Sequence, residues 1–241
     1  MKIYKKQYEL KNAAKDKLDG KYSPAMLICL YASLLTGCFS LIVDPFVPET
    51  SSMVLFYVTQ GVISLILSWL LGIFDLGLTY FFLNAACGRN YSTGNLFYCF
   101  QNDTAKTLTI SGVRAIVSTV CILPARYIFD VFWYTHNLSM LAAAGIAAVI
   151  GFGIYLYAGL GVTLSFFLQL DFPDKSAQDI LRQSFQLIHG HRKRLFLLQL
   201  SFLPLMLLCI CSLFVGFLWL EPYMQMTYTC FFLDLMNPRE V

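Results

Sequence analysis

Long apolar runs divide this 241-residue chain, and they limit its fold more than any other feature. A helix crosses the core of a bilayer with about 20 apolar residues, and only helices or closed barrels satisfy the backbone there. The runs are continuous rather than alternating, which favours helices over the strands of a barrel. Charged residues make up only 13% of the chain. The sequence therefore predicts an all-α, polytopic membrane protein.

A single membrane domain, 1–241, is expected to hold about six transmembrane helices in three hairpins. Two apolar runs, 53–87 and 138–170, exceed one perpendicular crossing at about 1.5 Å of rise per residue. The first of them either tilts, breaks near Gly72 and Gly77, or projects beyond the membrane, and projection is favoured. The predicted spans are 24–43, 53–87, 105–128, 138–170, 195–215 and 219–236. The predicted segments are a basic amphipathic helix at 1–22, a first hairpin at 24–87, a second at 88–170, an amphipathic linker helix at 171–192, and a third hairpin with a short tail at 193–241.

The positive charge lies almost entirely on one side of these spans. With six spans, 15 of the 17 Lys and Arg residues fall on the side that carries both termini. The opposite loops hold only Arg126 among basic residues, and the acids Asp44, Glu49, Asp130 and Glu221 fall on that side. Because cytoplasmic loops of membrane proteins are enriched in Lys and Arg, both termini are predicted to lie in the cytoplasm. The expected location is the plasma membrane.

Three short segments before the hairpins resemble one another. Each has an apolar residue two positions before Gly or Asn, the residues that best tolerate the left-handed conformation at the end of a helix. Each unit is therefore predicted to be a short interfacial helix on the cytoplasmic side, a helix C-cap and a helical hairpin. The C-caps are Gly20, Asn102 and Gly190, within Leu18-Asp19-Gly20, Phe100-Gln101-Asn102 and Ile188-His189-Gly190.

The amino-terminal segment reads as an amphipathic helix with seven lysines and three acids. This charge suits the anionic surface of an inner leaflet. The alternative is that the lysines only set the topology on a solvated helix. The linker helix has Ser176 as its N-cap, with Asp179 three residues later, close to a capping box.

A second basic cluster consists of His189, His191, Arg192, Lys193 and Arg194. One interpretation is a metal or phosphate site, but neither HExxH, a P-loop nor a carboxylate cluster accompanies it. The favoured interpretation is a basic collar at the cytoplasmic end of a span. Anionic lipid headgroups are its expected ligand.

Asp75 and Arg114 are the two charged residues expected inside or near the hydrocarbon. A charge there costs a few kcal/mol at the membrane centre and marks a candidate functional site. Both are placed toward the cytoplasmic half, so they are candidates for an intramembrane ion pair. Structural pairing is favoured over a role in transport.

Short motifs stand in a fixed order near the two ends of the chain. They are Lys11-x-x-Ala14-Lys15-x-x-Leu18-x-Gly20, then Ser184-Phe185, Gly190, Leu195-Phe196, Leu200-Ser201-Phe202, Gly216, Leu218-Trp219-Leu220 and Pro222-Tyr223. With these motifs the chain resembles the bacterial integral-membrane family catalogued as domain of unknown function 975. The region 124–138 departs from that family's pattern, which usually has an Ile-Pro-Gly turn there. The resemblance implies a polytopic bacterial membrane protein and no established activity.

Catalytic chemistry finds little support in the sequence. None of the eight cysteines forms a CxxC motif, and no nucleophile shares a plausible depth with a base. We therefore expect no catalytic residue, no metal, no cofactor and no nucleic-acid partner, and the sequence identifies no protein partner. The favoured function is a non-enzymatic protein that organises the membrane or binds lipid or partners. A small transporter or channel is the alternative, and an intramembrane enzyme is the third hypothesis.

Overall fold

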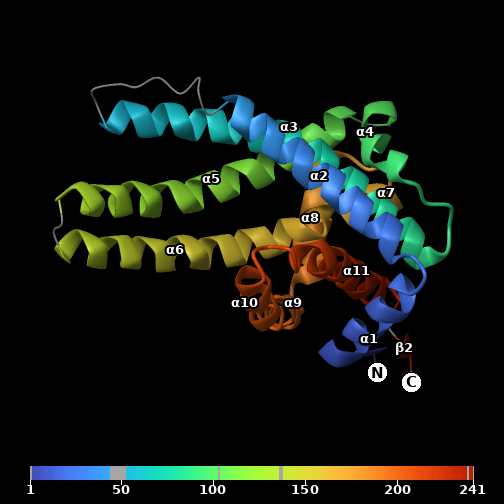
Figure 1. The fold of residues 1–241 in the computed structure, drawn as a ribbon. Coiled ribbons are helices and arrows are strands. Elements are labelled where there is room, and N and C mark those ends of the chain that lie inside the picture. The colour runs from blue at the N-terminus through green and yellow to red at the C-terminus, as the bar shows by residue number, and fades with distance from the viewer. Residues whose placement is uncertain (1, 44–52, 103, 136–137, 238, 241) are drawn as a thin grey trace.

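Helices form nearly all of the computed structural model, which describes residues 2–43, 53–102, 104–135, 138–237 and 239–240 (Figure 1). The opposite-side acids Asp44 and Glu49 lie outside these residues. The helices are α1 Gln7–Leu18, α2 Tyr22–Val43, α3 Met53–Cys87, the 3-10 helix η2 Thr93–Phe97, α4 Tyr98–Gln101, α5 Thr104–Thr135, α6 Leu138–Thr163, α7 Ser165–Asp171, α8 Ala177–Ile188, α9 Arg192–Leu200, α10 Leu203–Cys211 and α11 Phe217–Met236. The strands β1 Lys2–Ile3 and β2 Arg239–Glu240 pair in antiparallel fashion.

Within the described residues, five helical segments are long and apolar enough to cross a membrane. They correspond to the first five predicted spans. The predicted sixth, 219–236, is helical as α11, but this helix carries Glu221 and Asp234 and is not among the five. The six-span arrangement therefore stays a prediction. The five segments are Tyr22–Phe39, Leu55–Cys87, Thr104–Trp133, Ser139–Asp171 and Arg192–Cys211.

The long helices α3, α5 and α6 lie side by side and extend past the end of α2 (Figure 1). Helix α3 continues unbroken through Gly72 and Gly77. Gly72 allows close packing between helices: a Cβ built on it would lie only 2.3 Å from the Cβ of Ser111 on α5. A Cβ on Gly77 would lie 2.2 Å from the carbonyl oxygen of Leu96. These glycines let neighbouring backbones approach, as small residues do between membrane helices.

The densest core lies away from the ends of the long helices that extend past α2, in the region where α3, α7 and α11 end. Phe81, Phe82, Phe231 and Phe232 are fully buried there. The ring of Phe167 on α7 stacks on Phe232 of α11, with centroids 4.9 Å apart. The core is therefore built from the last parts of α3 and α11 together with the short helix α7. The two termini meet at this same end through the β1–β2 pair (Figure 1).

The short helices α1 and α8 have the same length and bury the same face. Each spans 12 residues, and apolar or small side chains four residues apart point inward. Helix α1 packs against α11 and α3, and α8 packs against α6 and α7. Their apolar faces are thus occupied by the protein itself. The buried residues are Leu10, Ala14 and Leu18 in α1, and Ile180, Ser184 and Ile188 in α8.

Both short helices end in the same turn. Asp19 has φ −57° and ψ 130°, Gly20 has φ 69°, and the amide of Lys21 donates to the carbonyl of Leu18 at 2.8 Å. These angles define a type II turn, whose third residue needs positive φ. The turn at Ile188–His191 repeats this arrangement, with Gly190 at φ 88° and a hydrogen bond of 2.9 Å.

The third expected C-cap differs from these two. Asn102 follows α4 with φ −140° and ψ 123°, which is extended rather than left-handed. Asn102 is thus the C-cap of α4, but it does not take the left-handed conformation. The physical reason is that α4 has only four residues and Phe100 is exposed, so the chain has no buried amphipathic helix to close there.

Candidate functional sites at two charged pairs

The first candidate site is the Asp75–Arg114 pair, which joins α3 to α5. Nη1 of Arg114 lies 2.8 Å from Oδ2 of Asp75. The side chain of Asp75 is 43% exposed, and that of Arg114 is 50% exposed. The pair is therefore well formed, but it borders an open space instead of being enclosed in the core.

The pair faces a pocket of about 370 Å³ between the long helices. Its wall combines apolar residues with hydroxyl groups from α2, α3, α5 and α6. The guanidinium of Arg114 also lies over the ring of Phe166, 5.9 Å from its centroid. The polar lining consists of Thr36, Ser64, Ser68, Asp75, Ser111, Arg114, Ser118 and Tyr155.

The serines of this pocket were missed in the sequence, although a signal for them exists. Ser64, Ser68 and Asp75 recur at four and seven residues on α3, and Ser111 and Ser118 are seven apart on α5. Residues at these spacings share one face of a helix. Polar residues inside an apolar run mark a pathway or a binding site when they share a face. The pocket can therefore offer hydrogen bonds and both signs of charge to a polar group.

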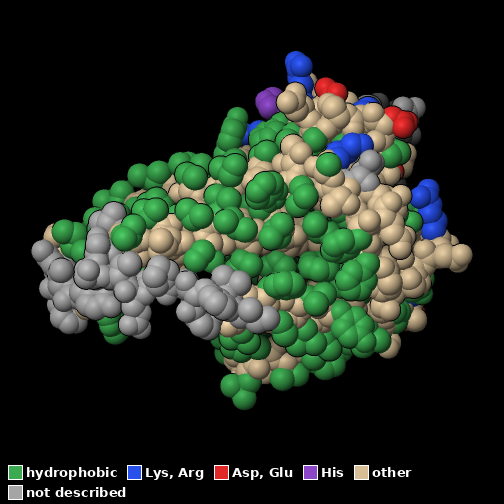
Figure 2. Space-filling view, turned by 90° about the horizontal axis from the view of Figure 1, so that it is seen from above, with side chains coloured by type: hydrophobic (Ala, Val, Ile, Leu, Met, Phe, Trp, Pro, Cys, Tyr) green, Lys and Arg blue, Asp and Glu red, His purple; other side chains and the backbone are tan. Residues whose placement is uncertain are grey.

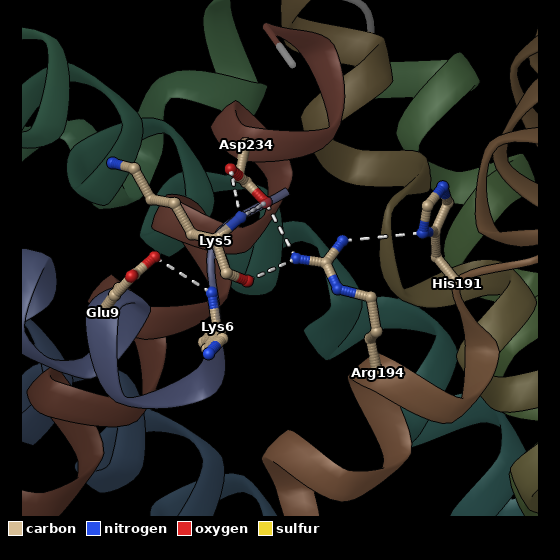
Figure 3. A network of polar contacts seen from close by, with 6 residues as sticks. All are labelled: Lys5, Lys6, Glu9, His191, Arg194 and Asp234. Carbon is tan, nitrogen blue, oxygen red and sulfur yellow. Dashed lines mark hydrogen bonds and ion pairs between the residues drawn. The ribbon is translucent and has the colours of Figure 1, made fainter. Parts of the chain in front are cut away.

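The second candidate site lies at the end where the termini meet (Figure 3). Nη2 of Arg194, at the start of α9, lies 2.9 Å from Oδ2 of Asp234 at the end of α11. The same nitrogen donates to the carbonyl of Lys5 at 2.7 Å, and the amide of Lys5 donates to both carboxylate oxygens of Asp234 at 3.2 Å. The Asp234 side chain is 3% exposed. This network fastens the amino-terminal segment to α9 and α11.

The ring of His191 completes the network on its outer side. Nδ1 of His191 lies 3.5 Å from Nη1 of Arg194. Because a guanidinium can only donate, a hydrogen bond between these atoms requires that Nδ1 carries no proton. Burial lowers the pKa of His191, the nearby Arg194 lowers it further, and Asp234 acts in the opposite direction. The imidazole also packs edge-on against Tyr4, with centroids 4.5 Å apart.

Some residues of the predicted basic collar contact other parts of the protein, and others are exposed at the surface. Arg194 is committed to Asp234 and Lys5, and Arg192 lies over the ring of Tyr157, 4.0 Å from its centroid. His189 and Lys193 are exposed. Only the exposed members have a side chain fully available to lipid headgroups.

The lysines of the first segment divide in the same way. Lys17 and Lys21 donate to the carbonyls of Ala86 and Ala85 at 2.6 and 2.9 Å. These carbonyls end α3, where the last turn of a helix has no internal donors and attracts cations. Lys15, in contrast, is exposed. Part of the amino-terminal charge thus caps a helix of the protein itself.

Apolar and charged surfaces are separated along the molecule. In Figure 2, apolar side chains cover much of the elongated part of the visible face, and charged side chains gather toward one end. Helix α6 exposes several large apolar residues to its surroundings. They include Ile146, Val149, Ile150 and Ile154.

No metal site accompanies either charged pair. Across the described ranges, no group of three or more His, Cys, Asp or Glu residues could hold a metal ion. The eight cysteines are free thiols. The chemistry that both sites can offer is hydrogen bonding and ion pairing.

Comparison with known proteins identifies one matching family. A family described as "Protein of unknown function (DUF975)" matches residues 1–238. No curated protein and no solved structure matches the chain.

Proposed function

The chain belongs to the DUF975 family of unknown function, and we propose that it is a non-enzymatic membrane protein that binds anionic lipid at its basic end. The observation that carries the proposal is the position of exposed lysines beside an apolar surface. Lys6, Lys15 and Lys193 are exposed at the end where the termini meet. A basic residue near an anionic membrane surface contributes about 1 kcal/mol to binding.

The apolar surface supports a position within a bilayer. Val149 of α6 is 72% exposed and Ile146 is 63% exposed, on a segment long enough to span a membrane. Contiguous apolar surface of this extent is unusual on a protein surrounded by water. With the long helices in the hydrocarbon, α1 and α8 lie at the boundary, where lysine stems contact apolar surface and their ammonium groups reach headgroups.

The proposal is tested by adding lipid to the full chain purified in detergent. Phosphatidylglycerol should raise the midpoint of thermal unfolding more than phosphatidylcholine with the same acyl chains. A ligand that binds only the folded state stabilises it by about 2.7 kcal/mol at 100 times its Kd. The difference should shrink as salt rises from about 0.05 to 0.5 M, because salt screens exposed charges. Equal stabilisation by both lipids at low salt contradicts the proposal.

A second candidate function, a small transporter, is favoured by the pocket at Asp75–Arg114. Substrate sites of transporters lie near the bilayer midplane and contain such polar groups. Nearby, Ser33 of α2 donates to the carboxylate of Glu221 at 3.4 Å, which adds another acid within the predicted spans. Proton flux into vesicles that contain the full chain distinguishes the two functions. A flux that Asp75→Asn abolishes without loss of folded protein supports transport, and the absence of flux counts against a proton transporter.

A further inference from the structure

A shallow apolar groove runs along α10 and α11 and opens at α1. Its volume is about 470 Å³, and none of its residues belongs to the pocket at Asp75–Arg114. One end carries Lys15 and Tyr22, and the other reaches the turn between the two helices. Its lining includes Lys15, Leu205, Leu208, Gly216, Trp219 and Tyr223.

The floor of the groove is apolar and faces outward. Leu208 is 64% exposed and Trp219 is 53% exposed. At the far end, α10 and α11 touch: a Cβ on Gly216 would lie 2.7 Å from Sγ of Cys209. From Tyr223 to Gly216 the helix rises about 10 Å at 1.5 Å per residue. The groove thus has the length and the apolar character to hold part of an acyl chain.

The mouth of the groove carries two neighbouring positive charges. Lys11 and Lys15 are four residues apart and face the same side of α1, as this spacing requires. Nζ of Lys11 donates to the carbonyl of Ser201 at 3.0 Å, and Nζ of Lys15 lies 5.8 Å from the centroid of the Tyr223 ring. Among the residues that the structure describes, no ion pair is formed by either ammonium group.

Two effects lower the pKa of Lys11, and the larger one is burial. Burial lowers the pKa of Lys11, and the charge of Lys15 lowers it further. An anion between the two ammonium groups would relieve this repulsion. A lipid phosphate at this position would leave its glycerol and acyl chains directed toward the apolar floor.

We propose that this groove binds one anionic glycerophospholipid, with the phosphate at Lys15 and one acyl chain along Leu205 and Leu208. This inference rests on the proposed lipid-binding function and assigns it a site. The occupant is a lipid because charge at one end and an apolar, outward-facing floor at the other match the polarity of a phospholipid. A soluble anion would use the lysines but would leave the floor empty.

The experiment uses the full chain in detergent and a short-chain phosphatidylglycerol, with bound lipid counted by native mass spectrometry. Lys15→Gln should raise the Kd about fivefold, the value of one basic residue beside an anionic surface. Arg89→Gln removes an exposed charge that does not line the groove and should change the Kd less than about twofold. Lys15→Arg keeps the charge and should restore binding.

Filling the floor tests the acyl-chain part of the proposal. Leu208→Trp should weaken phosphatidylglycerol binding, whereas Leu207→Trp should not, because Leu207 is 62% exposed on the same helix but does not line the groove. Free inorganic phosphate should not compete with the lipid. Thermal unfolding without lipid identifies any variant that is merely misfolded.

The outcomes separate this inference from the proposed function. Equal losses for Lys15→Gln and Arg89→Gln, or for both Trp variants, overturn the groove site while anionic-lipid binding stands. No preference for phosphatidylglycerol in the unchanged protein contradicts the proposed function itself.

Discussion

The molecule contains two Arg–Asp pairs of nearly equal length in different surroundings. The Arg194–Asp234 pair is 2.9 Å long, and its carboxylate is almost fully buried. The Asp75–Arg114 pair is 2.8 Å long, and both side chains are about half exposed to a pocket. Because the two distances are nearly equal, the pairs differ mainly in the exposure of their side chains.

The difference in burial implies different roles for the two ion pairs. A buried charge is tolerated when its partner and further hydrogen bonds replace water, and removing one partner is strongly destabilising. Asp234 has that complete set, with Arg194 and the amide of Lys5. The pocket pair has open space beside it, so a ligand or a partner can reach it. We therefore propose that the first pair holds the fold and that the second lines a pocket open to a ligand.

The largest expected effect follows from Asp234→Asn. The change leaves Arg194 largely buried without a counter-charge, and the free energy of unfolding should fall by about 3 kcal/mol. Thermal unfolding in detergent measures this loss. Lys193→Gln, one residue before Arg194 but exposed, is the control and should stay within about 0.5 kcal/mol. A loss at Asp234 no larger than at Lys193 would show that the pair does not hold the fold.

The next largest loss of stability is expected from a change at Gly72, in the wall of the pocket. Gly72→Ala places a Cβ against Ser111 of α5, and overpacking of this kind costs about 1–3 kcal/mol. Gly37→Ala on α2 is the control, because nothing lies within 4 Å of its Cβ. That change should leave stability unchanged or raise it by helix propensity. If both variants unfold at the same temperature, α3 and α5 are not in close contact at the pocket.

Single changes in the pocket pair should cost less than those in the buried pair. Asp75→Asn or Arg114→Gln should each lower the free energy of unfolding by about 1 kcal/mol, the scale of polar contacts between membrane helices. The double variant should recover part of the loss, since no unpaired charge remains. Folded yield and thermal unfolding in detergent report both results. Fully additive losses would mean that the two side chains do not meet.

The smallest effect is a pH dependence at the buried network. The pKa of His191 is lowered in the folded protein, so acid protonates the unfolded chain first and favours it. This part of the stability is present above the unfolded pKa of about 6.5 and falls as the pH drops below it. His191→Gln should flatten the curve between about pH 7.5 and 5.5, whereas the exposed His189→Gln should not. If stability depends on pH with the same slope in the His191 variant, His191 is not the source of this pH dependence.

The helices were predictable because their signals are local. The apolar run 53–87 matches α3, and 138–170 lies within one residue of α6 and α7 together. Gly20 and Gly190 take the left-handed conformation for which glycine is suited. Asn102 does not, because the helix before it is too short to bury a face. The sequence pattern alone could not show that difference.

The sites were only partly predictable because their contacts are distant in sequence. Asp75 and Arg114 stand out as charges within apolar runs, and their depth suggested a pair. Arg194 looked like a lipid-facing residue, because its neighbours are basic and exposed. Its partner Asp234 is 40 residues away, and no local pattern connects the two.

A double-mutant cycle on each charged pair, measured in one detergent by unfolding free energy, tests the central claim most directly. The claim is that the buried pair holds the fold and the exposed pair serves binding. The coupling between Arg194 and Asp234 should reach about 2–3 kcal/mol, and that between Asp75 and Arg114 should stay below about 1 kcal/mol. Equal couplings, or a stronger one at Asp75–Arg114, would contradict the account.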